Sequence, residues 1–129
     1  MEFLYCFANA SLTQRVLDYL LRQMRSHLEF VTVIFLNDRW VVRLKVDILS
    51  EAELCDDCCA FLNENGIPYH PPTTMFLAFK DLDAGRALTQ VMNRYHVAIV
   101  SHGAPDPEEI VCFQEQFVAG LGYCPQSLV

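Results

Sequence analysis

The sequence has few charged side chains, few basic ones in particular, and no long uncharged apolar run. Charged residues make up 19% and hydrophobic residues 53% of the 129 positions, which is the reverse of a disordered chain. No window approaches the roughly 18–20 uncharged apolar residues that a membrane-spanning helix needs. The 9 basic and 16 acidic side chains give a net charge of −7, which argues against a nucleic-acid partner.

The sequence also lacks the short signatures of common enzymes. It contains no P-loop, GxGxxG, GxSxG or HExxH pattern, and the spacing of its single Ser, His and Asp residues cannot place a catalytic triad. The first seven residues have neither the basic region nor the long apolar core of a secretory signal, so we expect a cytoplasmic protein. The length is typical of a single domain, which we assign to residues 1–129.

The six cysteines are expected to be reduced and mostly buried, because a chain this long and apolar can form a core without disulfides. Cys55 and Cys58 form a CxxC pair, which raises the question of zinc or redox chemistry. The pair falls inside a predicted helix together with Cys59, and no second CxxC exists. We therefore expect these thiols to pack in the core, with no metal and no cofactor.

Hydrophobic periodicity and capping signals predict alternating strands and helices. Asn37-Asp38 is expected to form a hairpin turn, and Ser11, Ser50 and Asp106 are expected to cap helices. A further helix, capped by Asp81 or Asp83, is expected to reach Tyr95. The predicted strands are residues 2–7, 30–36, 39–47, 74–79 and 96–101, and the other predicted helices are roughly residues 11–28, 50–65 and 106–122.

The predicted fold class is α/β (α+β). The first six elements have the βαββαβ order of a ferredoxin-like sandwich, which an α-β-α segment then extends. We expect residues 74–79 and 96–101 to be parallel neighbours joined by a right-handed crossover, and the sheet therefore to be mixed. Helices mainly on one face are the first choice, and helices on both faces are the alternative.

A candidate ligand-binding site follows the apolar strand 96–101, because ligands bind beyond the carboxyl ends of parallel strands. His102 is the group that can exchange a proton near pH 7. A turn in which Ser101 and His102 satisfy local backbone groups is the alternative. The residues of the candidate site are Ser101, His102 and Gly103, with Lys80 and Asp81 from the neighbouring strand and His70 from an extended rim.

The apolar run Phe30 to Leu36, with Trp40 on the next strand, suggests a bare sheet face that a second copy would cover. We therefore expect a homodimer. The charge is also uneven, since residues 1–50 carry a net +1 and residues 51–129 a net −8. Ordinary solvated faces explain this pattern, and the alternative is a two-signed surface that orients a partner.

Arg39, Arg43 and Lys45 share one face of the strand 39–47, but Val41 stands where an RNA-binding sheet would place an aromatic residue. We predict a small binding or regulatory module for a protein partner or small ligand, without nucleic acid or membrane. The alternative is a small enzyme that uses His102 for proton transfer.

Overall fold

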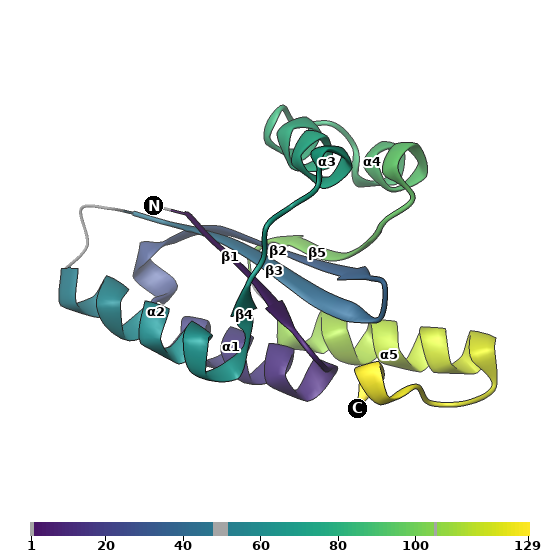
Figure 1. The fold of residues 1–129 in the computed structure, drawn as a ribbon, viewed down its shortest axis with the longest axis horizontal. Helices are drawn as coiled ribbons and strands as arrows, with labels where there is room; N and C mark the ends of the chain where they lie inside the picture. The colour runs from purple at the N-terminus through teal and green to yellow at the C-terminus, as the bar shows by residue number, and fades with distance from the viewer. Residues whose placement is uncertain (1, 48–51, 105) are drawn as a thin grey trace.

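The chain folds into a five-stranded antiparallel sheet with helices on both faces (Figure 1). The computed structural model describes residues 2–47, 52–104 and 106–129. The strands lie in the order β4-β1-β3-β2-β5. Their bounds are β1 Glu2–Phe7, β2 Leu28–Leu36, β3 Arg39–Val46, β4 Ile67–Pro68 and β5 Ala98–Gly103.

Three helices pack on one face of the sheet, and two cross the other (Figure 1). We call these the lower and the upper face. The lower helices are α1 Ala10–Gln23, α2 Ala52–Asn65 and α5 Pro107–Leu121, and the upper helices are α3 Thr73–Asp83 and α4 Leu88–Tyr95. Short 3₁₀ turns at Arg25–His27 and Gln126–Leu128 complete the described elements. The protein is therefore an α+β fold.

Strand β3 has the predicted two-residue alternation, and it divides the molecule into two cores. Trp40, Val42 and Leu44 are buried under the lower helices, whereas Val41 packs against the upper pair. The indole of Trp40 is 0% exposed, and its Nε1 donates a hydrogen bond to the carbonyl of Ser127 at 2.6 Å. Each face of the sheet therefore has its own apolar layer.

Several local signals give the predicted structure. Asn37 and Asp38 both adopt positive φ, at 52° and 60°, as a two-residue hairpin turn requires. Asp106 caps α5 by accepting a hydrogen bond from the backbone N–H of Glu108. The N-terminus of α1 differs from the prediction, because the side chain of Asn9 caps it and Ser11 lies inside the helix. The predicted cap Ser50 lies outside the described residues.

The predicted strand 74–79 is wrong, because residues 73–83 form α3. The buried side chains Met75, Ala78, Phe79 and Leu82 are spaced for one face of a helix. The helix predicted to run on to Tyr95 is interrupted near Gly85, which has a φ of 85°, and resumes as α4. The parallel crossover and the mixed sheet are also wrong, since each strand pairing is antiparallel.

Helices cover both faces of the sheet, so the alternative arrangement holds and the first choice does not. Trp40 and Phe35 lie under α5 of the same chain, where both rings contact Phe113. A second copy therefore cannot use that surface as predicted. Whether the chain dimerises stays a prediction.

The predicted burial of the cysteines is correct for Cys55 and Cys58 on α2, holds only partly for Cys59 and is wrong near the C-terminus. Cys55 and Cys58 are buried, and burial raises the pKa of Cys58 to about 12. Cys112 and Cys124 are exposed, and none of the six cysteines, which all lie in the described ranges, forms a disulfide. None of the helices in the described ranges is long and apolar enough to cross a membrane.

A matched pair of glycine substitutions tests how closely Gly66, which follows α2, approaches β1. A Cβ at Gly66 would lie 2.5 Å from both the carbonyl oxygen of Cys6 and the ring of Phe7. Gly66→Ala should lower the free energy of unfolding by about 1–3 kcal/mol in urea titrations. Gly120→Ala, in α5 with no atom within 4 Å, should raise it by up to about 1 kcal/mol. Equal effects would contradict this packing.

Candidate functional site

Three polar side chains lie in a row across β3, β2 and β5 on the upper face. The strand register places Thr32 beside Arg43 on one side and beside His102 on the other. The hydroxyl of Thr32 is 2.6 Å from Nδ1 of His102, and the imidazole tilts against the ring of Phe30. His102 is therefore held by neighbouring strands rather than by a turn.

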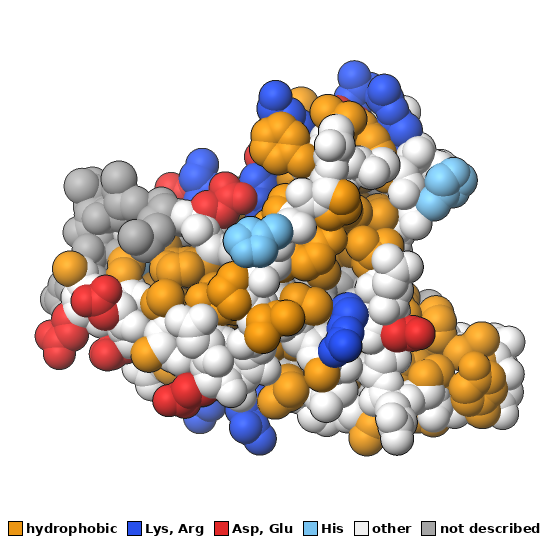
Figure 2. All heavy atoms as spheres, in the orientation of Figure 1, with side chains coloured by type: hydrophobic (Ala, Val, Ile, Leu, Met, Phe, Trp, Pro, Cys, Tyr) orange, Lys and Arg blue, Asp and Glu red, His pale blue; other side chains and the backbone are white. Residues whose placement is uncertain are grey.

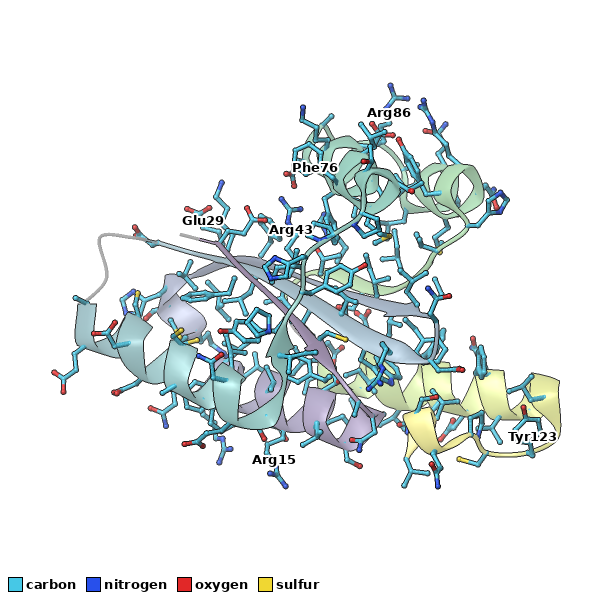
Figure 3. All side chains as sticks on the ribbon, viewed as in Figure 1. Arg15, Glu29, Arg43, Phe76, Arg86 and Tyr123 are labelled. Carbon is cyan, nitrogen blue, oxygen red and sulfur yellow. The ribbon has the colours of Figure 1, made fainter. Side chains whose placement is uncertain are left out.

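Arg43 is the centre of this row and is 5% exposed (Figure 3). Its Nε donates to Glu2 at 2.6 Å, and its two terminal nitrogens donate to the carboxylate of Asp83 at 2.9 and 2.6 Å. The guanidinium lies about 5 Å from the ring centres of Phe30 and Phe79. We call Glu2, Arg43 and Asp83 the Arg43 cluster. Its hydrogen bonds between Arg43 of β3 and Asp83 hold the end of α3 on the sheet.

The charges of the Arg43 cluster act on the neighbouring pKa values. The hydrogen bond from Arg43 lowers the pKa of Asp83, and burial opposes this effect. Burial and then the positive charge of Arg43 lower the pKa of His102, against the weaker opposite effect of Asp83. At pH 7 His102 is therefore neutral, as its hydrogen bond with Thr32 allows.

The structure does not bring the predicted site residues together. Ser101 points to the lower face, opposite to His102, and is buried near Glu109. Gly103 lines a separate cavity of about 370 Å³ between the end of α1 and the start of β2. Only His102 belongs to the polar row.

Lys80 and Asp81, predicted to follow a neighbouring strand, lie on α3. Asp81 accepts a hydrogen bond from Tyr95 of α4, and it pairs with Arg86 and Arg94. Lys80 is exposed and lies over the ring of Phe76. His70 is exposed in the connection between β4 and α3. Lys80 and Asp81 differ from the prediction because residues 74–79 form a helix, whereas His70 lies in the predicted connection.

Sequence reasoning missed the partners of Arg43. The strand alternation placed Arg43 on the face opposite to Trp40, which is correct. Glu2 and Asp83, however, are 41 and 40 residues away in the sequence, and neither has a local pattern that marks it as a partner.

A second feature lies along β5, which forms an edge of the sheet. Among the described strands β5 pairs with β2 alone, and a groove of about 260 Å³ is lined by residues of β5 and α5. The register leaves Val100 without an opposite residue, so β5 has a bulge there. The groove is lined by Ile99, Val100, Glu109, Cys112, Phe113 and Gln116.

The groove is acidic at one end. Burial, and then the charge of Asp106, raise the pKa of Glu109, and a contact with the Ser101 hydroxyl opposes the increase. In the part of the chain that the structure describes, no Lys or Arg forms an ion pair with Asp106, Glu108 or Glu109. A larger depression of about 750 Å³ lies elsewhere, around the Asn37–Asp38 turn and Tyr123.

Comparisons with known proteins add little to this geometry. The chain matches no protein-family model, and no curated protein matches it. It is similar to a solved structure described as the crystal structure of the C-terminal domain of YpbH, with 17% sequence identity and a TM-score of 0.44. The similarity covers 56% of this chain and 72% of that chain. At this TM-score the likeness carries no argument about fold or function.

Asp83→Asn should destabilise the protein, because it weakens two charge-assisted hydrogen bonds to the buried guanidinium of Arg43. We expect the free energy of unfolding to fall by about 1.5–3 kcal/mol in urea titrations. Glu29→Gln is the matched control, since Glu29 pairs with Lys45 at 3.6 Å and both side chains are about half exposed. It should cost less than about 1 kcal/mol. A similar loss in both variants would contradict the role of Arg43.

The lowered pKa of His102 predicts a pH dependence of stability. The unfolded chain has the ordinary His pKa of 6.5 and binds the proton more readily than the folded one. The contribution of neutral His102 is therefore fully present above about pH 6.5 and is lost as the pH falls below that value. In thermal melts, His102→Asn should lose less stability than the wild type between about pH 7 and 5. Parallel pH profiles would contradict the lowered pKa.

Proposed function

We propose that this chain is a protein-binding module and that the groove between β5 and α5 takes an extended segment of a partner protein. The observation that carries the proposal is the outer edge of β5, at the end of the sheet, beside a groove that has both apolar and polar lining residues. An extended peptide that adds to such an edge gains main-chain hydrogen bonds from the strand and specificity from the adjoining pockets.

The two edges of the sheet differ in what they offer. β4 has two residues, whereas β5 has six, and β5 is paired on one side only. Six residues are enough to pair with a short peptide strand. The bulge at Val100 interrupts the regular ladder, which is a common protection against indiscriminate pairing. This combination supports selective binding at β5.

The lining of the groove indicates the chemistry of the partner. Ile99, Val100 and Phe113 provide apolar contacts, and Glu109 provides a negative charge near Asp106 and Glu108. A matching segment has apolar side chains in alternate positions and at least one Lys or Arg. The −8 charge of residues 51–129 would also attract such a segment over a longer distance.

The surroundings of His102 favour binding over the small-enzyme alternative. Its Nδ1 bonds to Thr32, its ring lies against Phe30, and the nearby guanidinium of Arg43 already has its carboxylate partners. For the fold, we propose that residues 2–68 form a ferredoxin-like unit, in which β4 takes the place of the predicted strand 74–79. The support is their β1-α1-β2-β3-α2-β4 element order, with antiparallel neighbours in the order β4-β1-β3-β2.

An array of random peptides of about eight residues, probed with the purified chain, tests the groove. We expect the bound peptides to combine alternate apolar residues with Lys or Arg. The Glu109→Lys substitution should lower the affinity of the chain for the best peptide by about tenfold or more. The best peptide should also protect Cys112, which lines the groove, from alkylation. The exposed Cys124 is not a lining residue and should react as before.

Glu53→Lys is the matched control, because it makes the same charge reversal at an exposed position on α2. Its affinity for the peptide should stay close to that of the wild type. Equal losses in both lysine variants, or alkylation of Cys112 unchanged by the peptide, would contradict the proposal. Self-association through β5 that excludes the peptide would assign the edge to a second copy and would equally contradict it.

A further inference from the structure

Helix α3 has apolar side chains on both of its faces, and only one face is covered by the sheet. Met75, Ala78 and Phe79 are buried against the sheet. On the other side, Phe76 is 52% exposed and Leu77 is 44% exposed. The rest of the outer surface is polar, with Thr73, Thr74 and Lys80, and exposed apolar side chains rimmed by polar ones mark interaction sites. The outer face of α3 therefore has the composition of a contact surface.

The same helix pair carries an unusual charge for this protein. The three basic residues of positions 51–129 are Lys80, Arg86 and Arg94, and each of them lies on α3, on α4 or in the turn between them. Figure 2 shows basic side chains over α3 and α4, and acidic side chains at the far end of α2. Against these three cations the helix pair carries Asp81 and Asp83, so its net charge is +1 on a protein with a net charge of −7.

Lys80 is the cation of this layer that is available to a partner. Arg86 and Arg94 both pair with Asp81. Among the ion pairs of the described ranges, Lys80 has no carboxylate partner, and its Nζ lies 5.3 Å from the ring centre of Phe76. Phe76 and Lys80 therefore form an apolar contact and a free positive charge side by side.

The Arg43 cluster holds this surface in a fixed position. Asp83, at the end of α3, forms the two hydrogen bonds to the buried Arg43, while Met75 and Phe79 pack in the upper core. Figure 3 shows Arg43 beneath α3 and Phe76 on the side of the helix that faces away from α4. A surface that is ordered before binding loses less conformational entropy when it binds.

We propose that the outer face of α3, formed by Phe76, Leu77 and Lys80, docks an acidic, amphipathic segment of another protein. Apolar residues of that segment cover Phe76 and Leu77, and its carboxylates approach Lys80. This surface is separate from the groove along β5, and the chemistry of its partner is the opposite, since Glu109 favours a basic segment.

Two other occupants fit less well. A second copy packed symmetrically, α3 on α3, would offer Lys80 no acidic partner beyond the α3 carboxylates that are already paired, and its acidic helices α2 and α5 lie on the opposite face of the sheet from α3. Stacking of α2 or α5 on α3 is head-to-tail and does not close into a dimer. An anionic membrane is opposed by the overall charge of −7, with one unpaired cation on this surface. An acidic protein segment needs only the local charge at Lys80.

Two designed amphipathic peptides of about 15 residues test the proposal. Both have a leucine face, and the polar face is Glu in one and Lys in the other. Measured by fluorescence anisotropy, the affinity of the full chain for the Glu peptide should be at least about tenfold higher than for the Lys peptide. This affinity should fall as salt is added. Lys80→Glu, at an exposed position, should reverse this preference. Phe76→Ser should weaken binding of the Glu peptide by about tenfold.

Two controls separate this surface from the rest of the molecule. Arg39→Glu makes the same charge reversal at an exposed position on β3 and should leave binding of the Glu peptide unchanged. Glu109→Lys should not weaken it, because the groove along β5 is a different surface. A failure here and a failure of the groove experiment are therefore distinguishable.

Four results would overturn the docking proposal. The first is equal binding of the two peptides, and the second is the same affinity in Lys80→Glu as in the wild type. The third is a chain that binds phosphatidylserine vesicles but not the Glu peptide, with the vesicle binding abolished by Lys80→Glu. The fourth is a wild-type chain that self-associates and does not bind the Glu peptide, with the self-association abolished by Phe76→Ser.

Discussion

The upper layer of this protein depends on the burial of one guanidinium. Arg43 lies between two aromatic rings under α3, where an unpaired charge would cost several kcal/mol. Glu2 and Asp83 supply the hydrogen bonds that make the burial tolerable. Because Glu2 belongs to β1 and Asp83 to the end of α3, satisfying Arg43 also fixes the position of α3 on the sheet.

This arrangement determines which surfaces remain open. The lower helices cover Trp40 and the aromatic core, and α3 with α4 covers the upper apolar strip around Val41. The long strand edge that is left is β5, which lies between the two layers. The side chains near it are acidic on the α5 side, whereas the outer side of α3 has a free Lys80. Both surfaces belong to residues 51–129, so they differ in local charge rather than in the half of the sequence that they come from.

The sequence predicts those parts of the fold whose signals are local. Positive φ at Asn37 and Asp38, the Asp106 cap and the alternation around Trp40 each depend on adjacent residues. Residues 74–79 misled the prediction because α3 is apolar on both faces, so its pattern shows no helical period.

The predicted site followed from that error. Parallel strands would have brought Lys80 and Asp81 to His102, and a helix takes them elsewhere. His102 bonds instead to Thr32, and the carboxylate that reaches the polar row is Asp83, which bonds to Arg43. Such a pairing across 40 residues has no sequence signature. As part of α3, the same residues place Phe76 and Leu77 on the outer side of the helix.

Amide hydrogen exchange of β5, with and without a peptide selected for the groove, tests the central claim most directly. If the peptide adds as a strand, the outward amides of Ala98–Gly103 gain hydrogen bonds and their exchange should slow strongly, while exchange in β4 stays unchanged. Bound peptide with unchanged exchange in β5 would contradict the account.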